Sequence, residues 1–255
     1  VVPVVGVGFY IYTKLEFGKK LLRRRLEMLQ GEIEPYMKQN DDVIQMMRSS
    51  RLANVNLSYF LYKYVGFPTY GNTTAEYFPL GEEKFKAMLV ELEKAERFIF
   101  MEYFIVEEGI MWDSILDILK RKVQEGVEVR FMYDGMCSVA LLPYDYPKKL
   151  RRMGIKCKQF EEIKPVLSTS QNNRDHRKIC VIDGKVAFTG GVNLADEYIN
   201  QKERFGHWKD TAIMLKGDAV QSFTMMFLQM WNVTERTKED YSLYLTPKQR
   251  GFRRE

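Results

Sequence analysis

The sequence contains little histidine and cysteine, the side chains that most often hold metal ions together. Its 255 residues include two histidines and three cysteines, and the cysteines form no C-x-x-C pair and no zinc-type spacing with histidine. An odd number of isolated cysteines also provides no disulfide framework, so we expect Cys137, Cys157 and Cys180 to be reduced and buried, as in a cytosolic protein. The pattern predicts no metal and no cofactor.

The chain also lacks a segment long enough to cross a bilayer. It opens with the apolar run VVPVVGVGFYIY, which has 12 residues, whereas a spanning helix needs about 20. Positive charges follow this run instead of preceding it, which argues against a signal peptide; they are Lys14, Lys19, Lys20, Arg23, Arg24 and Arg25.

An apolar run with a cationic flank resembles the cytoplasmic end of a membrane helix. The other interpretation is a buried segment followed by a solvated basic helix. Pro3, Gly6 and Gly8 favour the first, because both residue types are more frequent in membrane helices than in soluble ones. We therefore expect a cell-membrane location, with the active domain on the cytoplasmic side.

Neither sign of charge dominates the chain. There are 39 Lys and Arg against 34 Asp and Glu, giving a net charge of +5. This suits an anionic partner such as a phospholipid headgroup or nucleic acid, but plain solubility explains it equally well. A hydrophobic fraction of 45% argues against disorder.

Two regions are expected along the chain. A turn cluster at 66–72 separates a helical membrane-proximal region, 1–71, from an α/β domain, 72–255. In the second region the residue patterns predict helices alternating with strands. The predicted helices are 82–96, 110–124, 146–153 and 219–231, and the predicted strands are 98–106, 127–133, 155–160, 178–182, 186–189 and 211–215. Such alternation predicts a mixed sheet with helices on both faces.

The most informative stretch runs from Asp175 to Asn193. Residues two apart in a strand point to the same side, so His176 and Lys178 should project together while Arg177 points away. Asp183-Gly184 predicts a hairpin turn. The returning strand should bring back a glycine pair and an asparagine near the same point.

The glycine pair, Gly190 and Gly191, would let the backbone approach a ligand closely. Asn193 is expected at a helix N-terminus, where free N–H groups favour an anion. A single His beside a Lys is often surface decoration, and a Gly-Gly pair is often a turn. The joint pattern H-x-K-x4-D-x6-G-G-x-N, however, has a chance frequency of roughly one in a hundred thousand for a chain of this length. We therefore predict a phosphate site.

This pattern resembles the HKD signature of the phospholipase D superfamily, and its surroundings resemble bacterial cardiolipin synthases. The supporting phrases are FMEYFIVEEG at 100–109, RFMYDGMCS at 130–138, the stretch 172–200, and HWKDTAIMLKGDAV at 207–220. The resemblance covers nearly the whole chain. One departure is Cys137, where the family usually has a small residue.

The resemblance implies an active site built from two HKD motifs, but this sequence carries one complete motif, since His207 and Lys209 are followed by Met214 at the position of the aspartate. We expect the chain to be one half of an enzyme whose second HKD half lies elsewhere. The alternatives are a single-motif phosphodiesterase or nuclease that completes its site as a two-fold dimer, and an inactive membrane-bound fragment.

The resemblance further implies that two phosphatidylglycerol molecules are converted into cardiolipin and glycerol. His176 would be the nucleophile and form a phosphohistidine, while Lys178 and Asn193 would bind phosphate oxygens beside Gly190 and Gly191. The implied partners are anionic phospholipid and the membrane, with no nucleic acid, metal or cofactor.

Three further carboxylates have predicted roles near this site. Asp183 belongs to the motif, but we expect it to hold the loop, since it lies about five residues from Lys178 along an extended strand. Asp210 could orient an imidazole or could be a surface cap. Glu102, together with Tyr103 on a central strand, could reach the pocket.

Overall fold

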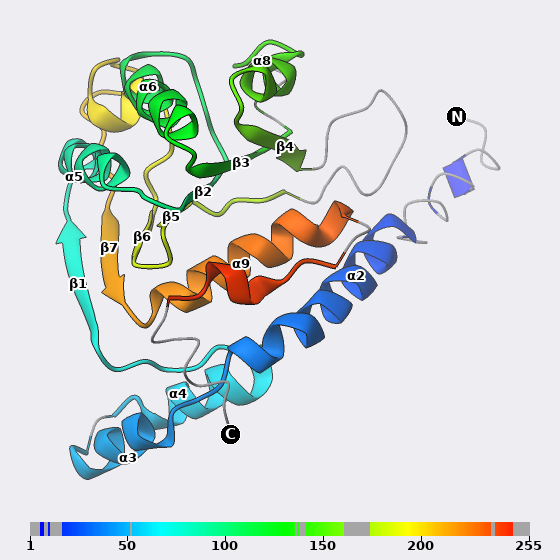
Figure 1. Ribbon diagram of the computed structural model, residues 1–255, viewed down its shortest axis with the longest axis vertical. Helices are drawn as coiled ribbons and strands as arrows, with labels where there is room; N and C mark the ends of the chain where they lie inside the picture. Colours follow the sequence, from blue (N-terminus) through cyan, green and yellow to red (C-terminus); the bar gives the residue numbers. More distant parts are fainter. Residues whose placement is uncertain are drawn as a thin grey trace.

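The chain folds around a seven-stranded mixed sheet (Figure 1). The computed structural model describes residues 17–51, 53–135, 137, 141–160, 174–235 and 238–246, together with Gly6, Val7 and Tyr10. The strand order is β1-β7-β6-β5-β2-β3-β4. The strands are β1 (Thr73–Phe78), β2 (Phe98–Tyr103), β3 (Glu128–Asp134), β4 (Lys156–Phe160), β5 (Ile179–Ile182), β6 (Val186–Gly190) and β7 (Ala212–Gly217).

Strands β2, β3 and β4 run parallel to one another, and every other neighbouring pair is antiparallel. The parallel strands are joined by α6 (Ile110–Gln124) and α8 (Tyr146–Arg152), as parallel connections require. The strands β5 and β6 instead form a hairpin. Strand β5 lies between β2 and β6, so the hairpin with the HKD residues occupies the middle of the sheet.

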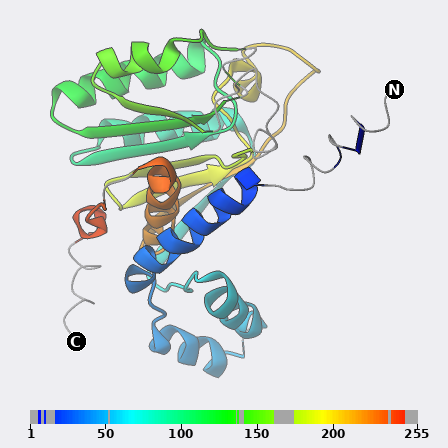
Figure 2. The ribbon, with the colours of Figure 1, turned by 90° about the vertical axis from the view of Figure 1, so that its right-hand side faces the viewer.

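Helices cover both faces of this sheet (Figures 1 and 2). The helices α5 (Gly81–Glu93), α6 and α8 lie on one face, while α9 (Val220–Trp231) and α2 (Phe17–Ile33) lie on the other. Strand β2 shows why. Ile99 and Met101 join one core, Phe98 and Phe100 join the other, and all six of its residues are buried. The predicted fold class is confirmed.

Each helix and strand predicted between 82 and 231 has a counterpart, with small differences at the ends. The predicted strand 98–106 ends at Tyr103, and Val106 instead forms an isolated parallel bridge with Leu194. The sequence prediction missed β1, which lies at one edge of the sheet and pairs with β7. Four of its six residues are exposed, so it lacks the apolar alternation of a half-buried strand.

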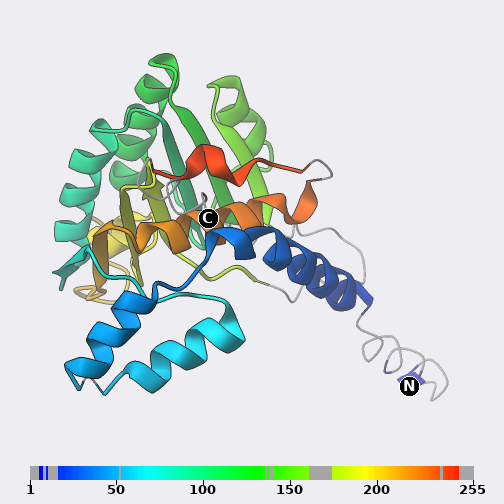
Figure 3. The same cartoon turned by 60° about the horizontal axis from the view of Figure 1, so that its bottom comes forward.

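The amino-terminal helices have two different environments (Figure 3). The helix α2 packs against α9, whereas α3 (Asp41–Ser49), α4 (Val55–Phe60) and the π-helical turn η2 (Leu61–Val65) extend away from the sheet layers. Within the described residues, no helix is both long and apolar enough to cross a membrane. The apolar run 1–12 lies outside the described residues except for Gly6, Val7 and Tyr10.

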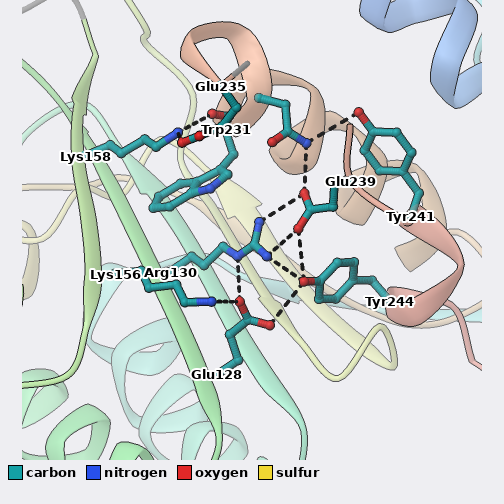
Figure 4. A network of polar contacts seen from close by, with 10 residues as sticks. Glu128, Arg130, Lys156, Lys158, Trp231, Glu235, Glu239, Tyr241 and Tyr244 are labelled. Atoms are coloured by element: carbon teal, nitrogen blue, oxygen red, sulfur yellow. Dashed lines mark hydrogen bonds and ion pairs between the residues drawn. The ribbon is translucent and has the colours of Figure 1, made fainter. Parts of the chain in front are cut away.

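A buried arginine ties the carboxy-terminal segment to the sheet (Figure 4). Arg130 of β3 donates hydrogen bonds to the Glu239 carboxylate and the Tyr244 hydroxyl, and its Nε lies 2.9 Å from Glu128 Oε1. Its guanidinium also lies 5.4 Å from the ring centroid of Trp231 at the end of α9. The buried charge is thus fully partnered, which its burial requires. This network holds η6 (Tyr241–Tyr244) against the same face as α9.

Candidate active site

His176 and Lys178 lie side by side just before β5. The Lys178 Nζ is 3.1 Å from His176 Nδ1 and 3.3 Å from Nε2, and it donates a 2.7 Å hydrogen bond to the His176 backbone carbonyl. Lys178 is buried, whereas His176 is exposed. An ammonium is therefore held directly beneath an accessible imidazole, and the two side chains share a face as the strand alternation predicts.

The side chain between them points to the opposite face. Arg177 places Nη2 2.8 Å from Glu102 Oε1 and Nε 2.9 Å from Asp175 Oδ1. Glu102 therefore does not reach the face that carries His176, contrary to the sequence expectation. The physical reason is the same alternation: Glu102 follows Phe98 and Phe100 on the α9 side of β2.

Glu102 and Asp175 form a coupled carboxyl pair on this reverse face. Burial raises the pKa of Glu102 well above its usual value, the interaction with Asp175 raises it further, and the Arg177 guanidinium opposes the shift. Burial alone would also raise the pKa of Asp175, but Glu102 and Arg177 together bring it below its usual value. The Glu102 carboxyl therefore holds its proton more tightly than the Asp175 carboxyl does.

The residues just before the motif are pinned to the end of β3. The Asp175 backbone N–H donates a 2.9 Å hydrogen bond to Asp134 Oδ2, and Arg174 Nη1 lies 3.4 Å from Asp134 Oδ1. Asp134 is completely buried. The sequence analysis does not single out Asp134 or Arg174, although Asp134 directly follows a predicted strand in the phrase RFMYDGMCS.

An aromatic ring completes the surroundings of the His-Lys pair. The ring of Phe104 lies 4.6 Å from the imidazole of His176, centroid to centroid, with an interplanar angle of 49°. The Lys178 Nζ lies 5.3 Å from the same ring centroid, within the usual range of a cation–π contact. Phe104 directly follows β2, but its aromatic character alone does not distinguish it from the core aromatics of that strand.

Cys137 fixes the segment that carries Phe104. Its Sγ donates a 2.9 Å hydrogen bond to the Phe104 carbonyl and accepts one of 3.3 Å from the Val106 N–H. Burial raises the pKa of the thiol to about 11, so it stays a donor at neutral pH. The residue that departs from the family pattern thus has a defined place beside the site.

At the two glycines, the space that a side chain would occupy is filled by residues at the start of the neighbouring strand β7. Gly190 has φ +143°, and a Cβ there would lie 2.4 Å from the Thr211 carbonyl oxygen. A Cβ on Gly191 would lie 1.9 Å from Asp210 Oδ1. The pair therefore brings the Asp210 carboxylate close to the backbone of the returning strand, where a larger residue would exclude it.

Asp210 contributes charge to the site. Burial lowers the pKa of Lys178 below its usual value, and the carboxylates of Asp210 and Asp175 oppose that shift. Asp210 Oδ1 accepts a 2.8 Å hydrogen bond from the Thr211 N–H. Within the described part of the chain, no hydrogen bond joins Asp210 to His176 or His207, and both predicted roles, orienting an imidazole and capping at the surface, stay predictions.

Asn193 is turned towards the protein. Its Oδ1 accepts a 3.0 Å hydrogen bond from the Ile105 N–H, its Nδ2 donates one of 2.8 Å to the Tyr198 hydroxyl, and the residue is buried. The expected helix N-terminus at Asn193 is wrong. A four-residue 3-10 helix, Asp196–Ile199, begins three residues later, and the intervening Leu194 N–H donates to the Ile105 carbonyl. The Leu194 N–H, which a helix start would have left free to bind an anion, is therefore already bonded to the segment after β2.

Asp183 lies at the other end of the hairpin from His176. Its carboxylate accepts hydrogen bonds from three consecutive backbone N–H groups, those of Glu96, Arg97 and Phe98, at 2.8 to 2.9 Å. Asp183 and Gly184 both have positive φ, 55° and 67°, as a type I′ turn requires. The carboxylate therefore joins the hairpin tip to the start of β2, at the far end of the hairpin from His176 and Lys178.

A second buried lysine lies on the same face of the sheet. Lys84 of α5 is 2% exposed, and its Nζ lies 3.2 Å from the Tyr103 hydroxyl and 5.2 Å from the ring centroid. Burial lowers its pKa to about 8. Among the described residues, no His, Cys, Asp and Glu side chains gather in a group of three or more that could hold a metal ion.

Comparison with known proteins gives the family. A family model described as "Cardiolipin synthase, PLD-like domain" matches residues 88–231, more than half of the chain. The chain belongs to this phospholipase D-like family. A cardiolipin synthase of Alkalihalophilus pseudofirmus is 34% identical over 252 residues, which cover 96% of this chain and 49% of that protein. An uncharacterized protein of Streptococcus mutans is 52% identical over 244 residues, covering 96% and 53%.

The chain spans about half the length of these curated relatives. Among solved structures, NUC of Salmonella typhimurium, a phospholipase D family member, matches with a TM-score of 0.47 and 17% identity, covering 63% of this chain and 93% of that chain. NucT from Helicobacter pylori matches with a TM-score of 0.48 and 13% identity, covering 63% and 97%.

Proposed function

We propose that this chain carries the first HKD half of a cardiolipin synthase, which transfers a phosphatidyl group between two phosphatidylglycerol molecules. The observation that carries the proposal is the buried ammonium of Lys178 directly beneath the exposed imidazole of His176. A nucleophilic nitrogen and a fixed positive charge at one point suit attack on a phosphodiester. Kinship with proteins called cardiolipin synthases supports the choice of phospholipid.

In the first step a ring nitrogen of His176 attacks phosphorus. A phosphorus–nitrogen bond forms, the bond to the glycerol oxygen breaks, and the leaving glycerol takes a proton from a second imidazole. That imidazole belongs to a second HKD half, because Met214 stands five residues after Lys209, where a motif that begins at His207 would need an aspartate. Lys178 stabilises the charge that develops on the phosphoryl oxygens.

In the second step the free hydroxyl of another phosphatidylglycerol attacks the phosphohistidine. The phosphorus–nitrogen bond breaks, the hydroxyl proton passes to the second imidazole, and cardiolipin leaves. Anionic phospholipid, the membrane and the second half are thus the partners in this proposal, and the site lies on the cytoplasmic side of the cell membrane.

The test uses the full-length protein with phosphatidylglycerol in mixed micelles, and measures cardiolipin and glycerol. Equal amounts of the two products are expected, with loss of turnover by at least about a thousandfold in His176→Ala, since the covalent route is removed. Phosphatidic acid in place of cardiolipin would mean hydrolysis, and an active His176→Ala would remove the nucleophile. Metal-independent DNA cleavage by a two-fold dimer of this chain would favour the single-motif alternative instead.

A further inference from the structure

An exposed aromatic surface projects from the molecule at the end of α4. Within the nine residues 57–65, seven large apolar side chains are exposed: Leu57, Tyr59, Phe60, Leu61, Tyr62, Tyr64 and Val65. We call these seven the aromatic face. The other exposed large apolar side chains of the described residues occur singly along the sequence, so the aromatic face is a local concentration of the kind that marks an interaction site. Figure 3 shows the helix that bears it, set apart from the sheet layers.

The helix below this face is firmly held. Ser58 is its one buried residue, and the Ser58 hydroxyl contacts that of Thr69. The Gln39 side-chain amide makes two hydrogen bonds to the Thr69 backbone: it accepts one of 2.8 Å from the N–H and donates one of 2.9 Å to the carbonyl. Gly66, with φ +80°, ends the helix. The apolar side chains therefore point outward from a fixed support.

The chain segment that bears the aromatic face carries charge of one sign. No Asp or Glu occurs in the 33 residues from Val43 to Ala75, although at the chain average of 34 in 255 about four would be expected. The same stretch contains Arg48, Arg51 and Lys63, all exposed. The Lys63 Nζ donates a 2.7 Å hydrogen bond to the Tyr59 hydroxyl and lies 5.7 Å from the Tyr64 ring centroid.

We propose that the aromatic face binds the boundary between headgroups and acyl chains of a bilayer rich in anionic phospholipid. Tyrosine is enriched at this boundary because its ring is apolar and its hydroxyl is polar, and lysine reaches from there to the headgroups. The absence of carboxylates from residues 43–75 lowers the repulsion that an anionic surface would exert on this segment. A face for another protein would more commonly be one apolar stripe with a rim of both charges.

The choice of phosphatidylglycerol as the anionic lipid rests on the proposed function, but docking does not require catalysis. Residues 1–12 could hold the chain to vesicles independently, so the measurement has to be local. Leu57→Cys, labelled with an environment-sensitive nitrobenzoxadiazole, reports from the aromatic face. The native cysteines are buried and leave the new thiol as the accessible one. Tyr77→Cys is the matched control, because Tyr77 and Leu57 are 64% and 55% exposed.

On vesicles of equal phosphatidylglycerol and phosphatidylcholine, the label at 57 should gain about threefold in emission with a blue shift, as expected for burial at the interface. Affinity for pure phosphatidylcholine should be at least about tenfold lower. The label at 77 should not respond. A silent label at 57 on protein that sediments with vesicles, or an equal response at 77, overturns the proposal. A response at 57 without vesicles, as protein concentration rises, assigns the face to a protein and also overturns it.

A second variant tests the side chains themselves. Phe60→Ser, Tyr62→Ser and Tyr64→Ser combined in the full-length protein should weaken the vesicle response of the label at 57 at least about tenfold, while turnover of soluble short-chain phosphatidylglycerol is retained. Tyr77→Ser should leave both unchanged. An undiminished response in the triple variant overturns the proposal. Loss of cardiolipin formation with the label response intact would instead count against the proposed function alone.

Discussion

The ring of Phe104 lies against the imidazole of His176, with 4.6 Å between the ring centroids. The same ring faces the Lys178 ammonium, so one aromatic side chain contacts both members of the HKD pair. Cys137 holds the backbone beneath this ring through its hydrogen bond to the Phe104 carbonyl. The imidazole is therefore positioned by a segment that precedes it by more than 70 residues.

Phe104→Ala should lower the turnover of the full-length enzyme by about tenfold, because a misplaced nucleophile loses alignment. Phe104→Tyr should retain activity, since the ring remains. Phe85, which is partly buried against the core on the α5 side of the sheet, provides the control: Phe85→Ala should lower thermal stability without a comparable loss of rate. Equal rates for Phe104→Ala and Phe85→Ala would show that Phe104 only fills space.

Gly191→Ala should destabilise the fold by about 1–3 kcal/mol, the usual range for forced overpacking. The added methyl would meet Asp210 Oδ1 at 1.9 Å. Gly31→Ala is the control, because a Cβ there meets nothing within 4 Å. Since Gly31 lies within α2, this substitution should raise the free energy of unfolding by about 0.5–1 kcal/mol. Urea unfolding gives both values. In the Asp210→Ala background the cost of Gly191→Ala should shrink, and strict additivity would contradict the contact.

Glu102→Gln should be at least as stable as the wild type at pH 7. The pKa of Glu102 is raised in the folded state, so above pH 4.5 the unfolded chain ionises while the folded chain keeps the proton, and the wild type loses stability as pH rises. Glutamine avoids that loss. Unfolding free energies measured from pH 4 to 7 should therefore shift increasingly in favour of Glu102→Gln. A loss of about 3 kcal/mol or more would show that a charged carboxylate is needed opposite Arg177.

Lys84→Met should stabilise the protein most at neutral pH. The pKa of Lys84 falls from 10.5 to about 8 on folding, so between these values the unfolded chain binds the extra proton and wild-type stability rises with pH. The advantage of Lys84→Met over the wild type should accordingly shrink by about 3 kcal/mol between pH 7 and 10.5. Taking this difference cancels the titration of the buried thiols. A constant difference across that range would mean that Lys84 keeps its charge in the fold.

Much of the fold could be predicted because its signals are local. Aromatic and β-branched residues marked β2, and Asp183-Gly184 marked the hairpin, whose turn has the expected positive φ values. The edge strand β1 could not be predicted, because its exposed side chains carry no burial pattern. Its place is decided by pairing with β7, more than 130 residues away.

The sequence by itself determined that His176 and Lys178 share a face, since alternation along a strand needs no knowledge of neighbours. Only the tertiary structure decided what surrounds them. Because β5 lies between β2 and β6, the ring of Phe104 contacts the imidazole of His176. The Asp210 carboxylate lies where a side chain on Gly191 would be. The Asn193 side chain accepts a hydrogen bond from the backbone after β2. Contacts between distant segments depend on the order of strands in the sheet, and no local pattern encodes that order.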